Sequence, residues 1–262
     1  MKKTLQILNG IAFISMIFIN YLSNTGLINN NTNATVSREF ENFFTPAGYA
    51  FSIWGIIYLL LLGFVIYQGL GLFSKAKENE LAKQVGWWFV VSCVANSLWL
   101  FAWLHESLGL SVFIMFVLLF SLIKIVLRTN MERWNAPFNT ILFLWWPFCI
   151  YIGWISVALI ANIAAFLTKI NWGRFGMSDV FWTITMIVVA GLLNLFVTWS
   201  RNMREFAFVG IWALIAIAIA NFNENNAIVI VAFTVSAVLL VSNAIHTYKN
   251  RKTLPFVRSL SK

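Results

Sequence analysis

The sequence predicts an all-α integral membrane protein, a polytopic bundle of about eight transmembrane helices. The first observation is composition: 60% of the 262 residues are hydrophobic and only 10% are charged, whereas soluble domains are about half apolar and a quarter charged. The second is the length of the apolar runs, since a helix needs about 20 apolar residues to cross the hydrocarbon layer. The third is the clustering of basic residues at alternate ends of these runs.

Eight apolar runs are the candidate spans. They lie at about residues 5–23, 46–68, 85–104, 108–127, 138–167, 179–200, 206–222 and 227–247. The fifth run contains Pro147, which lacks a backbone donor and clashes with the preceding turn, so we expect a kink between Phe143 and Pro147. Residues 24–45 form the only long polar connection, and their Asn-rich composition predicts an external loop.

The basic residues give the expected orientation. With eight spans, fifteen of the 18 Lys and Arg residues fall on one side, and only Arg38, Lys169 and Arg174 fall on the other. Because short cytoplasmic loops are rich in Lys and Arg, both termini are expected in the cytoplasm of a multi-pass protein, which we place in a bacterial cytoplasmic membrane. The same bias explains the net charge of +9 without a nucleic-acid partner.

The two ends of the chain carry separate expectations. The basic tail from Lys249 to Lys262 is expected to lie on anionic lipid headgroups. The N-terminal run also resembles a signal peptide, but it shows no small-residue cleavage site. We favour a retained first helix and leave cleavage open.

The sequence lacks the motifs of common enzyme classes. It has no nucleophile elbow, phosphate-binding loop or zinc-protease helix, and its two cysteines stand in separate spans, which suggests neither a disulfide nor a metal cluster. All nine acidic residues fall in loops or at helix ends, which disfavours ion-coupled transport. The pattern favours a non-enzymatic role and leaves an enzymatic one open.

Three of the runs carry aromatic and amide side chains at helical spacing. These stripes are Ala47, Phe51, Trp54 and Tyr58; Ser92, Asn96, Trp99 and Trp103; and Pro147, Tyr151, Trp154, Ala158 and Asn162. The pattern alone favours core packing between helices. The alternative is a flat aromatic cavity with few polar anchors, which suits a planar hydrophobic ligand.

At these residues the sequence resembles the tryptophan-rich sensory protein family, also called the translocator protein or TspO/MBR family. The family's second helix opens with T-P-P-x-W-x-F-x-x-x-W-x-x-x-Y, which Thr45, Pro46, Phe51, Trp54 and Tyr58 match in order and spacing. Its N-x-x-W motif matches Asn96 and Trp99, and its W-x-x-x-A-x-x-x-N motif matches Trp154, Ala158 and Asn162. Ala47 and Tyr49 depart from the first motif.

The resemblance implies a five-helix domain over residues 1–171, with residues 172–262 as a three-helix extension outside the usual family length. The family's W-Y-x-x-L-x-K-P stretch is missing from the first loop. That loop usually closes the ligand pocket, so its divergence leaves the ligand's identity open.

The resemblance also implies a function. It is a membrane binding or sensory protein for a planar hydrophobic ligand, either a tetrapyrrole such as protoporphyrin or a sterol-like molecule, with no required cofactor and often in a homodimer. Trp54 and Trp154 would line the pocket with Ala158 beside the ligand, while Asn96, Trp99, Tyr58 and Asn162 would support its walls and Phe51 would complete the set by packing. Some relatives are reported to promote porphyrin breakdown. The alternative function is a transporter or exporter of small hydrophobic molecules.

Overall fold

The computed structural model describes residues 1–74 and 79–251, and within these ranges the regular secondary structure is helical. The α-helices are α1 (Lys2–Leu22), α2 (Asn33–Glu39), α3 (Ile53–Gly69), α4 (Leu81–Val85), α5 (Trp88–Leu104), α6 (Leu108–Arg128), α7 (Phe138–Thr140), α8 (Trp146–Lys169), α9 (Asp179–Arg201), α10 (Arg204–Ala220) and α11 (Asn226–Lys249). Short 3₁₀ helices are η1 (Gly48–Ser52), η2 (Leu70–Leu72) and η5 (Arg174–Gly176), and η4 (Ile141–Trp145) is a π-helix. Lys75, Lys77 and residues 252–262 of the basic tail lie outside the described residues.

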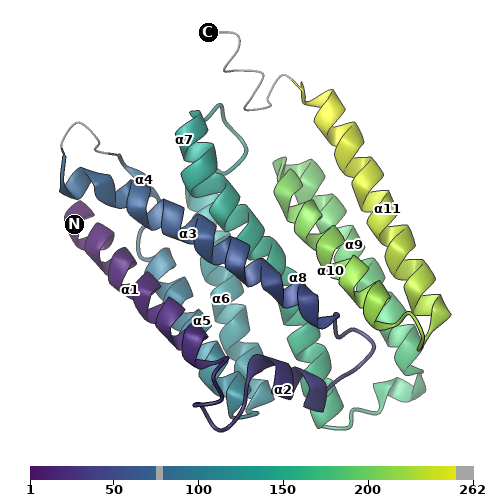
Figure 1. The fold of residues 1–262 in the computed structure, drawn as a ribbon. Coiled ribbons are helices and arrows are strands. Elements are labelled where there is room, and N and C mark those ends of the chain that lie inside the picture. The colour runs from purple at the N-terminus through teal and green to yellow at the C-terminus, as the bar shows by residue number, and fades with distance from the viewer. Residues whose placement is uncertain (75–78, 252–262) are drawn as a thin grey trace.

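Each of the eight predicted spans is occupied by a long helix. Six helical segments are long and apolar enough to cross a membrane, which confirms an integral membrane protein with a polytopic helical bundle. The other two are α5 and α10, with 17 residues each, which is the lower end of the range for a spanning helix. In Figure 1, α1 begins and α11 ends toward the upper end of the bundle, and α2 lies across the lower end.

Five of the long helices close into a ring. Going round it, α1 packs on α3, α3 on α8, α8 on α6, α6 on α5, and α5 returns to α1. The last three helices stand beside this ring, on the right in Figure 1, with α10 packed against α8 and α9 and α11 packed against α10. Helix α10 is therefore the element that joins the two groups.

Close helix contacts in this joint depend on glycine. A Cβ atom at Gly153 of α8 would lie 3.1 Å from Val209 and 3.4 Å from the backbone of Phe206, so the bare backbone lets α10 approach α8. At Gly210 of α10 a Cβ atom would lie 2.4 Å from the Asn194 side chain of α9. Small residues commonly permit such approach between membrane helices.

A π-helix lies where the sequence predicted a kink. The π-helix Ile141–Trp145 directly precedes α8, and Pro147 lies in the first turn of α8. A proline interrupts the ladder of hydrogen bonds in a helix interior, and a π segment is one way to accommodate the interruption. The long fifth run therefore contains α7, the π-helix η4 and α8 in succession.

The predicted external loop over residues 24–45 contains a helix that the sequence analysis did not foresee. The Thr32 side chain accepts a hydrogen bond from the Thr35 amide, and the Thr35 hydroxyl in turn accepts one from the Thr32 amide. This reciprocal capping box starts α2. The connection is thus a short helix laid across one end of the ring rather than an open loop.

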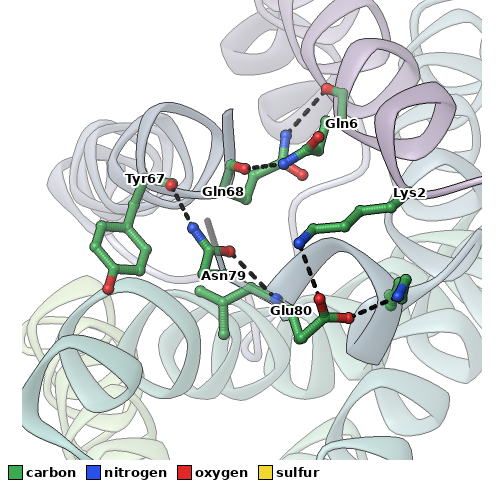
Figure 2. A network of polar contacts seen from close by, with 8 residues as sticks. Lys2, Gln6, Tyr67, Gln68, Asn79 and Glu80 are labelled. Atoms are coloured by element: carbon green, nitrogen blue, oxygen red, sulfur yellow. Dashed lines mark hydrogen bonds and ion pairs between the residues drawn. The ribbon is translucent and has the colours of Figure 1, made fainter. Parts of the chain in front are cut away.

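At the end of the ring away from α2, polar side chains connect α1 to neighbouring segments, and Figure 2 shows these contacts. Lys2 pairs with Glu80 at 2.9 Å, and Lys83 pairs with the other oxygen of the same carboxylate at 3.0 Å. Hydrogen bonds from Lys2 and then Lys83 hold the pKa of Glu80 below its ordinary value. These exposed pairs tie the start of α1 to the segment that leads into α4.

A buried amide pair lies beside these contacts. The Gln68 side chain donates to the Gln6 carbonyl at 3.0 Å, and the Gln6 side chain donates to the Gln68 carbonyl at 2.5 Å. The Gln68 side-chain oxygen also accepts a hydrogen bond from Asn9 at 3.3 Å. Because lipid offers no alternative partner, these bonds fix the pairing of α1 with α3.

Replacement of this glutamine should lower stability. In Gln68→Leu the buried Asn9 amide loses its partner, and we expect a loss of about 1 kcal/mol and a lower melting temperature in detergent. Ile66→Leu is the matched control, because Ile66 is 56% exposed on the same helix. Equal melting temperatures for Gln68→Leu and the control would contradict the assigned role.

Candidate functional site

Two adjoining cavities lie where the ring of five helices meets α2. The first, which we call the aromatic cavity, has a volume of about 60 Å³. Six of the eight predicted site residues line it: Phe51, Trp54, Trp99, Trp154, Ala158 and Asn162. Three stripes that lie far apart in the sequence therefore meet around one space.

Three of the rings that line this cavity, Trp54, Trp99 and Trp103, belong to a row of near-parallel rings that continues to Tyr58. Trp54 stacks on Tyr58 with ring centroids 5.4 Å apart and on Trp99 at 6.4 Å, and Trp99 stacks on Trp103 at 6.0 Å. The angles between these planes are 24°, 28° and 26°. We call Tyr58, Trp54, Trp99 and Trp103 the aromatic row, and its surface is mostly apolar.

The ring of Trp154 meets this row edge-on, and the ring of Phe51 meets Trp154 in the same way. Trp154 of α8 lies 6.3 Å from Trp54 at an interplanar angle of 83°, and Phe51 lies 6.0 Å from Trp154 at the same angle. Phe51 was expected to pack, and it also lines the cavity. The geometry differs from the predicted single helix face, because Phe51 belongs to the 3₁₀ helix η1 that precedes α3.

Buried amides support the aromatic row from behind. Asn96 does not line either cavity; its side-chain oxygen accepts from Asn20 at 2.8 Å and its nitrogen donates to the Tyr151 hydroxyl at 3.2 Å. The Tyr58 hydroxyl donates to Asn20. This network joins α1, α3, α5 and α8 through side chains that the membrane cannot satisfy.

A second amide lies on the far wall. Asn162 of α8 is buried and exchanges hydrogen bonds with Ser111 of α6, at 3.0 Å and 3.2 Å. It still lines the aromatic cavity. Asn162 was predicted to support the pocket wall, and Ser111 is its hydrogen-bond partner in the structure.

Two indole groups in this wall have no such partner. The Nε1 donors of Trp99 and Trp154 are buried and make no hydrogen bond within the described residues. A buried donor without a partner is unusual and costs free energy.

The second space, the outer cavity, measures about 730 Å³. It lies between α1, α2 and the segment leading into α3, and Tyr58 lines it together with polar residues such as Asn20, Arg38 and Glu41. The two cavities share six lining residues: Asn33, Ser37, Thr45, Pro46, Phe51 and Trp54. They are neighbouring spaces, of which the aromatic cavity is narrow and mostly apolar and the outer cavity is wider and has more polar groups in its lining.

Several residues of this site were not among the predicted ones. Asn20 is the centre of the amide network, Phe40 and Phe44 close the aromatic cavity beside α2, and Ile217 reaches it from α10. Thr32 and Thr35 were the available signal for α2, as a helix start inside a polar segment. Ile217 carries no signal, because it is one aliphatic residue in an apolar run.

Other reactive side chains lie outside the site. Ser242 and His246 do not form a pair: Ser242 accepts from the Trp199 indole at 2.9 Å, and His246 contacts Asn202 at 3.1 Å. Within residues 1–74 and 79–251, no group of three His, Cys, Asp or Glu side chains is placed to hold a metal ion. The two cavities are lined mainly by aromatic rings, small side chains and amides.

Comparison with known proteins gives one match. The model of the TSPO-like protein family matches residues 6–245, whereas no curated protein and no solved structure matches the chain. The matched segment includes α9, α10 and α11 as well as the five-helix ring, and the division of the chain at residue 171 stays a prediction. Because the match covers most of the sequence, the chain belongs to the TSPO-like protein family.

Proposed function

We propose that the protein binds a planar hydrophobic ligand, a tetrapyrrole such as protoporphyrin or a sterol-like molecule, in a binding or sensory role within the membrane. The observation that carries the proposal is the aromatic row, Tyr58, Trp54, Trp99 and Trp103, beside a wide cavity. A flat ring system gains most from stacking against such a surface. Membership in the TSPO-like family supports a membrane ligand-binding or sensory role, without naming the ligand.

The two volumes favour a particular position for the ligand. Pockets for small molecules measure roughly 300–1,000 Å³, a range that includes the outer cavity at about 730 Å³ but excludes the aromatic cavity at about 60 Å³. We therefore place the body of the ligand in the outer cavity against Phe51, Trp54 and Tyr58. Only one edge of it would enter the aromatic cavity.

The polar groups favour a ligand with hydrogen-bonding substituents. The free indole donors of Trp99 and Trp154 supply two anchors near the aromatic row. Asn20, Arg38 and Glu41 supply donors and acceptors in the outer cavity. A few fixed polar groups in a largely apolar site set the orientation of a ligand. The possible homodimer stays a prediction.

Removal of the central indoles should weaken binding. Protoporphyrin titrated into the purified protein should show saturable binding by its own absorbance. Trp54→Phe and Trp154→Phe should each raise Kd about three- to tenfold, because each loses ring overlap worth about 0.5–1.5 kcal/mol.

Trp88→Phe is the matched control for this experiment. Trp88 stacks edge-on with Phe120 at 5.6 Å and lines neither cavity. The control should bind like the unchanged protein. Saturable binding that is unaffected by both site substitutions would contradict the assigned position.

Transport of small hydrophobic molecules is the second candidate function. The observation in its favour is a set of buried polar atoms among the last three helices that have no hydrogen-bond partner in the described part of the chain. These atoms are Asn194 Oδ1, Thr198 Oγ1, Arg201 Nε, Arg204 Nη1, Asn243 Oδ1 and His246 Nδ1. Buried polar groups within membrane helices often mark a pathway.

A flux measurement separates the two functions. Proteoliposomes loaded with protoporphyrin should retain it under the binding proposal, apart from the leak of protein-free vesicles. Release that depends on the protein and disappears in Trp54→Phe would support transport instead.

A further inference from the structure

The rim of the candidate site, which we call the rim segment, is the later part of the connection between α2 and α3. It comprises residues 43–52, of which 43–47 are irregular and Gly48–Ser52 form η1. Phe44, Thr45, Pro46 and Phe51 of this segment line the aromatic cavity. Irregular backbone at membrane depth must find hydrogen-bond partners within the protein, because lipid offers none. The partners of this rim segment therefore decide how firmly the site is held.

Three hydrogen bonds connect the rim segment to α10. The Asn221 side chain, just past the end of α10, donates to the Phe43 carbonyl at 2.9 Å. The Ala47 amide donates to the Ala216 carbonyl at 3.0 Å, and the Trp212 indole donates to the Ala50 carbonyl at 3.1 Å. The three bonds follow the rim segment from Phe43 to Ala50, while their partners run in the opposite chain order, from Asn221 to Trp212.

Packing follows the same line. The ring of Trp212 meets Tyr49 edge-on, with centroids 5.1 Å apart. Trp212, Ala216 and Ala220 recur at intervals of four residues and so lie along one side of α10. Ile217, fully buried, lines the aromatic cavity, and Ala220 lines the outer cavity. One side of α10 thus holds the rim and forms part of the wall.

Helix α10 is itself fixed to the opposite wall. Its first two turns lie on α8 at Gly153, and its Glu205 carboxylate accepts a hydrogen bond from the Trp146 indole at 3.1 Å. Helix α8 carries Trp154 and Ala158. Helix α10 therefore contacts both the rim segment and the helix that carries these two residues, in addition to the direct contact of Phe51 with Trp154.

From these contacts we propose that α10 completes the ligand site. Ile217 is a specificity-determining residue of its wall, and Trp212 and Asn221 are positioning residues that hold the rim segment without touching the ligand. The ligand part of this inference rests on the proposed function, and the positioning part rests on the contacts alone. The three C-terminal helices are then part of the binding protein rather than an attachment to it.

A larger side chain at position 217 tests the wall. Ile217→Phe adds volume into a cavity of about 60 Å³ and should weaken protoporphyrin binding tenfold or more. Ile219→Phe makes the same change two residues away, where the side chain is 47% exposed, and should leave binding unchanged. Ile217→Phe with an unchanged Kd and melting temperature would overturn the assignment of the wall.

Loss of one indole donor tests the rim. Trp212→Phe keeps a ring beside Tyr49 but removes the bond to Ala50, so amide hydrogen exchange in residues 43–52 should accelerate at least fivefold. The Kd for protoporphyrin should rise about three- to tenfold. Trp182→Phe is the matched control, because its indole also donates to a backbone carbonyl, that of Arg174 at 2.9 Å, but far from the rim.

The two readings of this experiment separate the two proposals. Absence of saturable protoporphyrin binding to the unchanged protein would count against the proposed function for that ligand, while hydrogen exchange still decides the role of Trp212. Faster exchange over residues 43–52 in Trp212→Phe, but not in Trp182→Phe, supports the positioning role. Exchange at the unchanged rate would overturn it, whatever binds.

Discussion

The requirement that every buried polar group find its partner inside the protein governs this structure. In lipid, the hydrophobic effect does not drive one apolar helix onto another, so packing and interhelical hydrogen bonds select neighbours. At the end of the ring away from α2, Gln6 and Gln68 pair α1 with α3. At the end near α2, Asn162 and Ser111 pair α8 with α6. Asn20 and Asn96 join α1 to α5. These amides specify which helices adjoin.

The candidate site is one place in the described residues where this requirement is relaxed, and the last three helices are another. The amides behind the aromatic row are bonded to one another, which holds Tyr58 and Trp54 in position, whereas the indole donors of Trp99 and Trp154 in front have no partner in the described residues. Exceptions to local satisfaction tend to occur at functional sites. The site thus has a layer of hydrogen-bonded amides on one side of the aromatic row and indole donors without hydrogen bonds in the residues that line the aromatic cavity.

The sequence predicted the elements of the fold better than their mutual contacts. Long apolar runs revealed the spans, and helical spacing revealed which side of each span carries Trp54, Trp99 or Trp154. Periodicity names a face but not the helix it meets, so the role of Asn20 could not be read from its run. Helix α2 was not predicted because its seven residues are too few to show a helical period. Its capping residues are also of the types that are common in polar loops.

The contribution of α10 was hidden for a different reason. Ile217 is apolar among apolar residues, and Trp212 could equally have been one of the aromatic residues at a membrane interface. Their roles come from the rim segment, whose backbone bonds at Ala47 and Ala50 are satisfied by α10. Without α10 these groups would need water or another chain. The boundary predicted at residue 171 separates Ile217 and Ala220 from the other residues that line the two cavities.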